Sequence, residues 1–177
     1  TVFLSVCKII AHLIIPLTFA ILLNEVRFSI FKRWVQTVVY LPHFISWVIL
    51  AGVVIDMLSL DGIINSTLKM FGVEPIMFMA KNSWFPTIIV SSDIWKEFGF
   101  AAIIYLAALA GINPSLYEAA EMDGANRLKQ LWYVTLPSLV PTVVLLATLS
   151  IGNILNAGFD QIFNMYNPLV YKSGDII

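Results

Sequence analysis

Tyr117-Glu118-Ala119-Ala120-Glu121-Met122-Asp123-Gly124-Ala125 is the stretch of sequence around which this 177-residue chain is organised. It is a polar segment between two long apolar runs. Just before it, Pro114 suits the first position of a helix, and Ser115 with Glu118 fits an S-x-x-E capping box. Gly124 predicts the end of this helix, because glycine takes the left-handed conformation without a steric penalty.

A second short helix is expected directly after this one, from Ala125 to Tyr133, with Arg127 and Lys129 exposed. Leu136-Pro137 then opens the next apolar run, and a proline in a first helical turn costs little because its missing N–H has no partner there anyway. The two short helices form an elbow that cannot span a membrane itself. We expect it to be held by something outside the membrane.

The composition of the chain excludes an ordinary soluble domain. It is 59% hydrophobic and only 12% charged, whereas soluble chains carry roughly a quarter charged residues. The net charge of −1 gives no indication of a nucleic-acid partner, and none is expected. The single cysteine, Cys7, excludes an internal disulfide and a multi-cysteine metal site, and no metal is expected.

Long apolar runs predict four membrane spans, at about residues 2–23, 35–59, 85–110 and 136–159. Each is long enough to cross a bilayer as a helix. The loop at 111–135 contains the elbow. The predicted fold class is therefore an all-α membrane protein, a multi-span helical bundle in which residues 1–177 form one domain.

The positions of the basic residues predict the orientation of the spans. Loops that face the cytoplasm carry an excess of lysine and arginine. The loops assigned to the cytoplasm contain Arg27, Lys32, Arg33, Arg127 and Lys129, and the outer segments contain Lys69, Lys81 and Lys172. Both ends of the chain then lie outside, so we expect one further span before Thr1, one after Ile177, and six in the intact subunit.

Ionisable residues occur inside the third predicted span, at Asp93, Lys96 and Glu97. Such residues usually face the interior of a helical bundle or a water-filled cavity, which favours a role in a transport pathway. The alternative is a local pair between Asp93 and Lys96, three residues apart, that only neutralises charge. The sequence leaves both interpretations open.

Polar residues in the other spans are expected to have structural partners. Lys8 should extend its ammonium group toward the membrane surface, and His12 should bond to a neighbouring helix. His43 is interpreted as a packed or interfacial residue rather than a ligand. Asn153 and Asn156 share one helix face and should point to protein or water rather than lipid.

The elbow resembles the cytoplasmic EAA loop found in the permease subunits of binding-protein-dependent ABC importers. The residues that carry this resemblance are Glu118-Ala119-Ala120, Gly124, Val134 and Leu136-Pro137, each at the spacing of the family. Three further stretches resemble the branch that imports sugars: Leu22-Leu23-Asn24-Glu25, Trp95-Lys96-Glu97-Phe98-Gly99 and Tyr105-Leu106-Ala107-Ala108-Leu109. The resemblance thus extends along nearly the whole chain.

This resemblance implies a multi-pass subunit of a bacterial inner (plasma) membrane, in contact with the lipid bilayer. Its implied partners are two ABC ATPase subunits, a second permease subunit that is identical or paralogous, and an extracytoplasmic solute-binding protein. ATP and Mg²⁺ would be bound by the ATPase partner, with no cofactor on this chain. The residues implied to couple to the ATPase are Glu118, Ala119, Ala120, Asp123, Gly124, Leu136 and Pro137.

The expected function is the translocation of a sugar or oligosaccharide-like solute. The sequence contains no phosphate-binding loop, metalloprotease motif or nucleophile elbow, so an enzyme is not expected. The alternatives are a secondary transporter, which should show internal repeats, and a membrane scaffold, which would not need ionisable residues in several spans. Because sugars need hydrogen-bonding groups and aromatic faces, the pathway candidates are Asn153, Asn156, Trp95, Asp93 and Glu97.

Overall fold

The computed structural model describes residues 2–152 and 158–166, and all regular structure in these ranges is helical. The first eight elements along the chain are α1 (Val2–Glu25), α2 (Ser29–Tyr40), the 3₁₀ turn η1 (Leu41–Phe44), α3 (Trp47–Leu58), α4 (Ile63–Met70), the 3₁₀ turn η2 (Phe78–Ala80), α5 (Phe85–Ala110) and α6 (Pro114–Met122). The others are α7 (Arg127–Gln130), the π-helical segment η3 (Leu131–Thr135), α8 (Leu136–Gly152) and α9 (Phe159–Met165).

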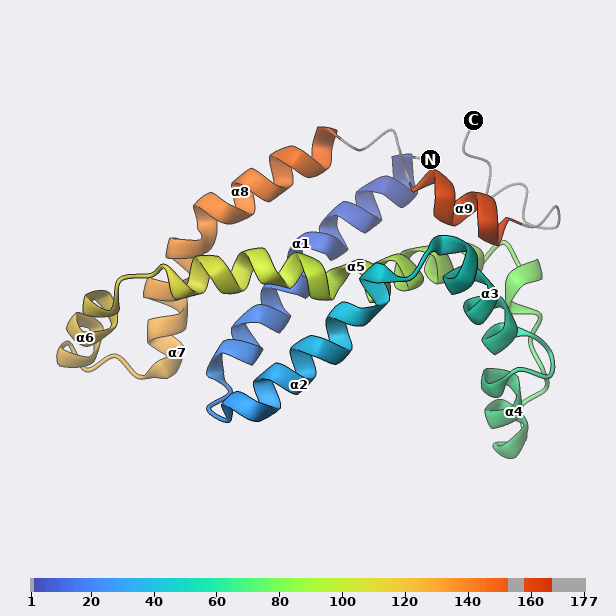
Figure 1. The fold of residues 1–177 in the computed structure, drawn as a ribbon, viewed down its shortest axis with the longest axis horizontal. Helices are drawn as coiled ribbons and strands as arrows, with labels where there is room; N and C mark the ends of the chain where they lie inside the picture. Colours follow the sequence, from blue (N-terminus) through green and yellow to red (C-terminus); the bar gives the residue numbers. More distant parts are fainter. Residues whose placement is uncertain (1, 153–157, 167–177) are drawn as a thin grey trace.

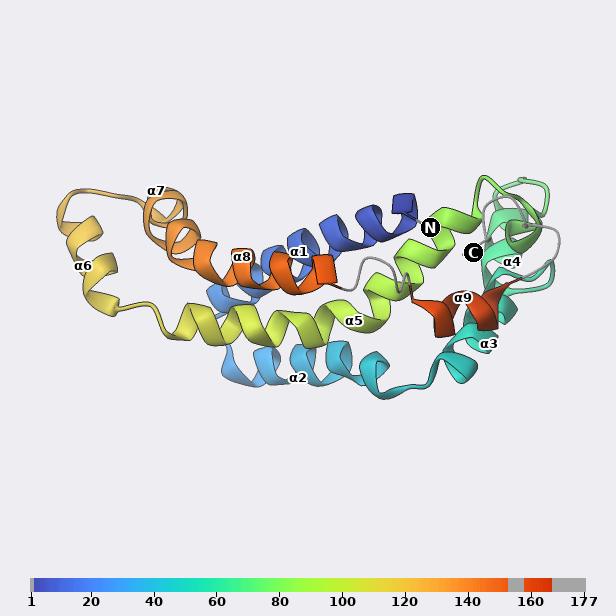
Figure 2. The same cartoon turned by 90° about the horizontal axis from the view of Figure 1, so that it is seen from above.

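Helix α5 runs along the length of the molecule, and the other long helices pack around it (Figure 1). The elbow of α6 and α7 lies at one end, while α3, α4 and α9 lie at the opposite end in both views (Figure 2). Within the described residues, three stretches are long and apolar enough to cross a membrane: Leu4–Glu25, Trp47–Met70 and Arg127–Gly152. Helices α5 and α6 meet the same criteria only as a pair that bends by 64°.

Two buried clusters hold the helices together, and α5 contributes to both. At the elbow end, Ala20 of α1 and Ala102 of α5 are fully buried, and their small side chains let the two helices approach closely. Tyr105 is also fully buried, and its hydroxyl donates to the carbonyl oxygen of Leu13 at 3.3 Å. At the other end, Ile162 and Met165 of α9 pack with residues of α3 and α5.

The predicted span at residues 35–59 is wrong as a single helix. Helix α2 already begins at Ser29 and ends at Tyr40, where η1 takes over with Pro42 in its first turn. Proline has no N–H to continue an α-helical ladder, and the chain is extended at Ser46 before α3 begins. Helix α3 then turns away from the direction of α2 (Figure 1).

The segment after α3 is folded around one buried side chain. Asn65 of α4 is fully buried; its amide nitrogen donates to the carbonyl oxygens of Ser59 and Ile76, each at 2.9 Å. Its amide oxygen accepts from the Ile76 N–H at 2.8 Å. Helix α4 ends at Met70, and Gly72 follows it in the left-handed conformation, with a φ of +76°.

Helices α2 and α5 touch at Gly99. A Cβ atom on Gly99 would lie 2.3 Å from the carbonyl oxygen of Val39, a distance that packed atoms do not adopt. Gly52 in α3 offers a contrast within the same chain, because a Cβ atom there would meet nothing within 4 Å. Only the first glycine is therefore required for packing.

We predict that Gly99→Ala lowers the thermal unfolding midpoint of the purified protein in detergent, because overpacking costs about 1–3 kcal/mol. The control, Gly52→Ala, should leave the midpoint unchanged or raise it slightly, since alanine is favoured over glycine within a helix. Circular dichroism during heating measures both. Equal midpoints for the two variants would show that α2 does not depend on close approach at Gly99.

Candidate functional site

The elbow is capped at both ends of α6. Its first cap is Asn113, whose side-chain oxygen accepts from the Ser115 N–H at 3.1 Å. The expected Ser115–Glu118 capping box is therefore wrong: Pro114 is already the first helical residue, which places Ser115 inside the helix. At the other end, Gly124 has the expected left-handed conformation, with a φ of +75°.

The turn after α6 is closed by backbone hydrogen bonds. The N–H of Gly124 donates to the carbonyl oxygen of Glu121 at 2.9 Å, and that of Ala125 reaches back to Ala120 at 2.8 Å. This pattern satisfies the last carbonyl groups of the helix. Asn126 then caps α7 by accepting from the Lys129 N–H at 2.9 Å. The elbow is thus fixed by its own sequence.

Two side-chain contacts connect the elbow to the long helices. The hydroxyl groups of Tyr117 in α6 and Thr135 in η3 are 2.9 Å apart. Arg127 in α7 pairs with Glu25 at the end of α1, with 3.0 Å between Nη1 and Oε2. Both charged side chains are exposed, so the ion pair adds little stability, but it defines where α7 meets α1.

The structure brings the expected coupling residues to one end of the molecule (Figure 1). Glu118, Ala119, Asp123 and Gly124 are exposed, and Ala120 is half-buried. Leu136 and Pro137 form the start of α8. Between the elbow and the end of α1 lies a cavity of about 560 Å³, lined by polar side chains that include Asn24, Glu25, Tyr117, Glu121, Arg127 and Gln130. An exposed and rigid elbow of this kind is suited to seating in another protein.

A second polar region lies along α5. Asp93 is held between two residues of α1: its carboxylate is 3.3 Å from Lys8 Nζ and 2.7 Å from His12 Nε2. The expected contact of His12 with a neighbouring helix is therefore confirmed. The expectation for Lys8 is wrong, because this side chain is buried rather than extended toward a surface.

Glu97 forms a similar cluster one helical turn further along α5. Its carboxylate is 3.3 Å from Lys96 Nζ and 2.8 Å from His43 Nδ1. The local pair between Asp93 and Lys96 is thus wrong, because each residue has another partner. The ring of His43 also stacks on Phe100 with 4.0 Å between the ring centroids, which agrees with a packed histidine.

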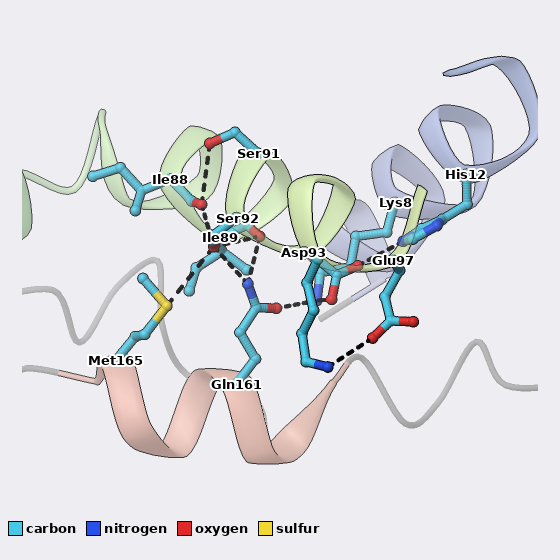
Figure 3. A network of polar contacts seen from close by, with 11 residues as sticks. Lys8, His12, Ile88, Ile89, Ser91, Ser92, Asp93, Glu97, Gln161 and Met165 are labelled. Carbon is cyan, nitrogen blue, oxygen red and sulfur yellow. Dashed lines mark hydrogen bonds and ion pairs between the residues drawn. The ribbon is translucent and has the colours of Figure 1, made fainter. Parts of the chain in front are cut away.

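Sequence reasoning missed Gln161, which is fully buried on α9 (Figure 3). Its amide nitrogen donates to the carbonyl oxygen of Ile89 at 2.6 Å and to Ser92 Oγ at 2.8 Å. Its amide oxygen accepts from Lys8 Nζ at 2.5 Å. The available signal was one amide beside the apolar Ile162, and this does not distinguish a buried side chain from an exposed one.

The pathway candidates do not form one group. Asp93 and Glu97 are four residues apart on α5 and belong to the two ionic clusters. Trp95 is partly exposed and instead lines an apolar cavity of about 260 Å³ with Met57 and Ile88. Asn153 and Asn156 lie outside the described residues.

The described fold is that of an all-α protein with several helices long and apolar enough to cross a membrane. Residues 12–159 match the family of the binding-protein-dependent transport system inner membrane component. The chain belongs to this family, whose members are transport permeases rather than enzymes. The location in a membrane follows from the family and from the apolar helices.

Named relatives agree with this assignment. The polygalacturonan/rhamnogalacturonan transport system permease protein YteP of Bacillus subtilis is 45% identical over 154 residues, covering 86% of this chain and 48% of the relative. Protein LplB of the same organism is 43% identical, covering 91% and 51%. The lactose transport system permease protein LacF of Rhizobium radiobacter is 31% identical, covering 93% and 55%. The chain spans about half the length of these curated relatives.

The fold also matches a solved structure, that of a bacterial ABC transporter involved in the import of the acidic polysaccharide alginate. The TM-score is 0.94 with 42% sequence identity, covering 98% of this chain and 61% of the other. A second structure shows the alginate transporter in complex with an alginate pentasaccharide-bound periplasmic protein, with the same TM-score and identity. The predicted fold class is therefore confirmed.

We predict that Asn113→Ala frays the start of α6, because the loss of a side-chain cap costs about 0.5–2 kcal/mol. Amide hydrogen exchange in residues 114–122 should become several-fold faster. Ser115→Ala serves as the control and should change this exchange little, since its hydroxyl is not the observed cap. A larger effect for Ser115→Ala would restore the capping box and contradict the observed geometry.

Proposed function

We propose that this chain is part of the membrane-spanning permease subunit of an ATP-driven importer that takes up a sugar or oligosaccharide. The relatives named for the transport of polygalacturonan/rhamnogalacturonan and of lactose support the solute class. The observation that carries the proposal is the elbow, which combines the family's sequence pattern with a rigid, exposed position at one end of the helices.

The elbow has the properties of a mechanical coupling element. Glu118 and Ala119 lie on its exposed side, where the small side chain of Ala119 allows a close approach by an ATPase subunit. Its other side is fixed through Tyr117 to η3, which continues directly into α8, and through Arg127 to α1. A displacement of α6 by the ATPase would therefore be passed to two long helices.

The remaining parts of the proposed machine belong to other chains. Two ABC ATPase subunits would bind ATP and Mg²⁺, and the elbow would dock on one of them. A solute-binding protein would deliver the solute on the opposite side of the membrane. Long apolar helix faces remain exposed on α1, α3 and α8, as at Leu22, Val48 and Leu145. We assign these faces to a second permease subunit and to lipid.

The solute pathway is proposed to follow the polar face of α5. Glu97 and His43 retain partly exposed side chains, so their polar atoms can exchange hydrogen bonds with sugar hydroxyl groups. Asp93 is more enclosed and would act mainly by fixing its partners. Trp95 offers an aromatic face on a neighbouring side of the helix.

The orientation can be tested with two matched methionines, Met70 in α4 and Met122 in α6, which are 86% and 88% exposed. Cys7 is first replaced, and Met70→Cys and Met122→Cys are then introduced singly into the intact subunit. A membrane-impermeant thiol reagent added to whole cells should label only the Met70→Cys protein. Labelling of only the Met122→Cys protein would place the elbow outside and end the coupling proposal.

Coupling at the elbow is tested by Gly124→Val. A β-branched residue in the left-handed conformation costs about 1–2 kcal/mol, so docking of the ATPase should weaken by about tenfold. Glu118→Lys should also weaken docking, because it reverses the charge near the start of α6. In proteoliposomes, solute uptake and binding-protein-stimulated ATP hydrolysis should fall together for both variants.

The matched control for this experiment is Gly72→Val. Gly72 also has a φ of +76°, and a Cβ atom at either glycine meets nothing within 4 Å, so both substitutions introduce similar strain. Because Gly72 lies at the opposite end of the molecule, its variant should keep normal ATPase docking. Equal loss of docking in the two valine variants would mean that strain, and not the elbow, is responsible.

A further inference from the structure

Helix α9 depends on its contacts with the rest of the bundle. It has seven residues, which is too short for a helix that is stable on its own in water. Its buried side chains are Gln161, Ile162 and Met165, which pack toward α3 and α5. The position of α9 is therefore decided by how these side chains are held.

The polar part of this contact joins three helices (Figure 3). Gln161 donates to the Ile89 carbonyl oxygen and to Ser92 on α5, and it accepts from Lys8 on α1. The same Lys8 ammonium group lies 3.3 Å from Asp93 on α5. One buried amide thus connects α9 to the ionic cluster between α1 and α5.

The start of α9 is shaped to fit this lysine. Gly158 precedes the helix with a φ of +76°, a conformation that suits glycine. A Cβ atom on Gly158 would lie 2.8 Å from Lys8 Nζ and 3.5 Å from Gln161 Oε1. The ammonium group therefore packs directly against the backbone at which α9 begins.

The contact can open without leaving a charge unpaired. If α9 moves away, Lys8 keeps Asp93, and Asp93 also keeps His12. The neutral amide of Gln161 and its partners on α5 must then exchange their hydrogen bonds for bonds to water. Well-packed apolar residues often stabilise a buried contact as well as polar groups do. A hydrogen bond between protein groups, by contrast, can be exchanged for bonds to water at a modest net cost.

We propose that Gln161, seated on the Lys8–Asp93 pair, is a releasable latch that holds α9 against α1 and α5 and opens during each import cycle. The proposal rests on the proposed import function. A mechanical route is present, because α1 carries Lys8 near one end and Glu25, the partner of Arg127 in the elbow, at the other. Movement of the elbow and release of α9 would therefore act on the same helix.

Met165 provides a reporter for the position of α9, because its side chain is buried under the helix near Ser92. Met165→Cys is introduced into the intact subunit with Cys7 replaced, and the complex is reconstituted with its ATPase and binding protein. The rate of maleimide labelling is measured at rest and after trapping with ATP, vanadate and loaded binding protein. We expect labelling to be about tenfold faster in the trapped complex, as the undocked population rises.

Substitutions in the latch should release α9 without nucleotide. Gln161→Leu should make labelling fast already at rest, and Ser92→Ala, a milder change that removes one acceptor, should give a smaller increase. The matched control is Lys96→Met. Lys96 is a buried lysine like Lys8, but it lies on α5 and its ammonium group contacts His43 and Glu97 rather than α9. Labelling at position 165 should therefore stay slow in this variant.

The outcomes separate the latch from the import function. The Met165→Cys complex could show stimulated ATP hydrolysis and yet be labelled equally slowly at rest and after trapping. The contact of α9 would then be permanent, and this result would overturn the latch. Fast labelling at rest in Lys96→Met would also overturn it, because general loosening would then explain the result. Absence of binding-protein-stimulated hydrolysis in the unsubstituted complex would instead contradict the proposed function.

Discussion

The close packing of α1 against α5 is the contact on which the other parts of the structure depend. It is possible because Ala20 and Ala102 are small and because Tyr105 bonds across to the α1 backbone. In a bilayer, apolar side chains gain little by leaving lipid, so helices associate through such close fits and through polar bonds. Helix α8 packs against this pair, and the elbow joins α5 to α8.

Much of this arrangement could be predicted because it is local. The end of α6 at Gly124 and the helical character of the long apolar runs each follow from residues that are near one another in the sequence. The break at Pro42 was missed because an apolar run predicts a span without showing whether its backbone stays straight. The predicted cap at Ser115 and the observed cap at Asn113 are two residues apart, and sequence patterns do not resolve the end of a helix more finely than this.

The ionic clusters could be predicted only in part, for a different reason. Asp93, Lys96 and Glu97 stood out because charges are rare in apolar helices, but Lys8, His12 and His43, which complete their clusters, are far away in the sequence. A local pairing rule joined Asp93 to Lys96, while the fold supplied Lys8 and His12 from α1. Each carboxylate finally contacts one lysine and one histidine. Both partners of Asp93 come from α1, whereas Glu97 pairs with Lys96 of α5 itself and with His43 of η1.

The π-helical segment at Leu131–Thr135 determines which side of α8 faces α1 and α5. An added residue in one turn rotates everything beyond it by about 100° relative to a regular α-helix. That offset lets Arg127 face the end of α1 while Leu139 is buried with Ala20 and Ala102. Deleting one residue from this segment would rotate Arg127 relative to Leu139, so only one of the two contacts could be kept. The number of residues in the segment is therefore constrained by both contacts.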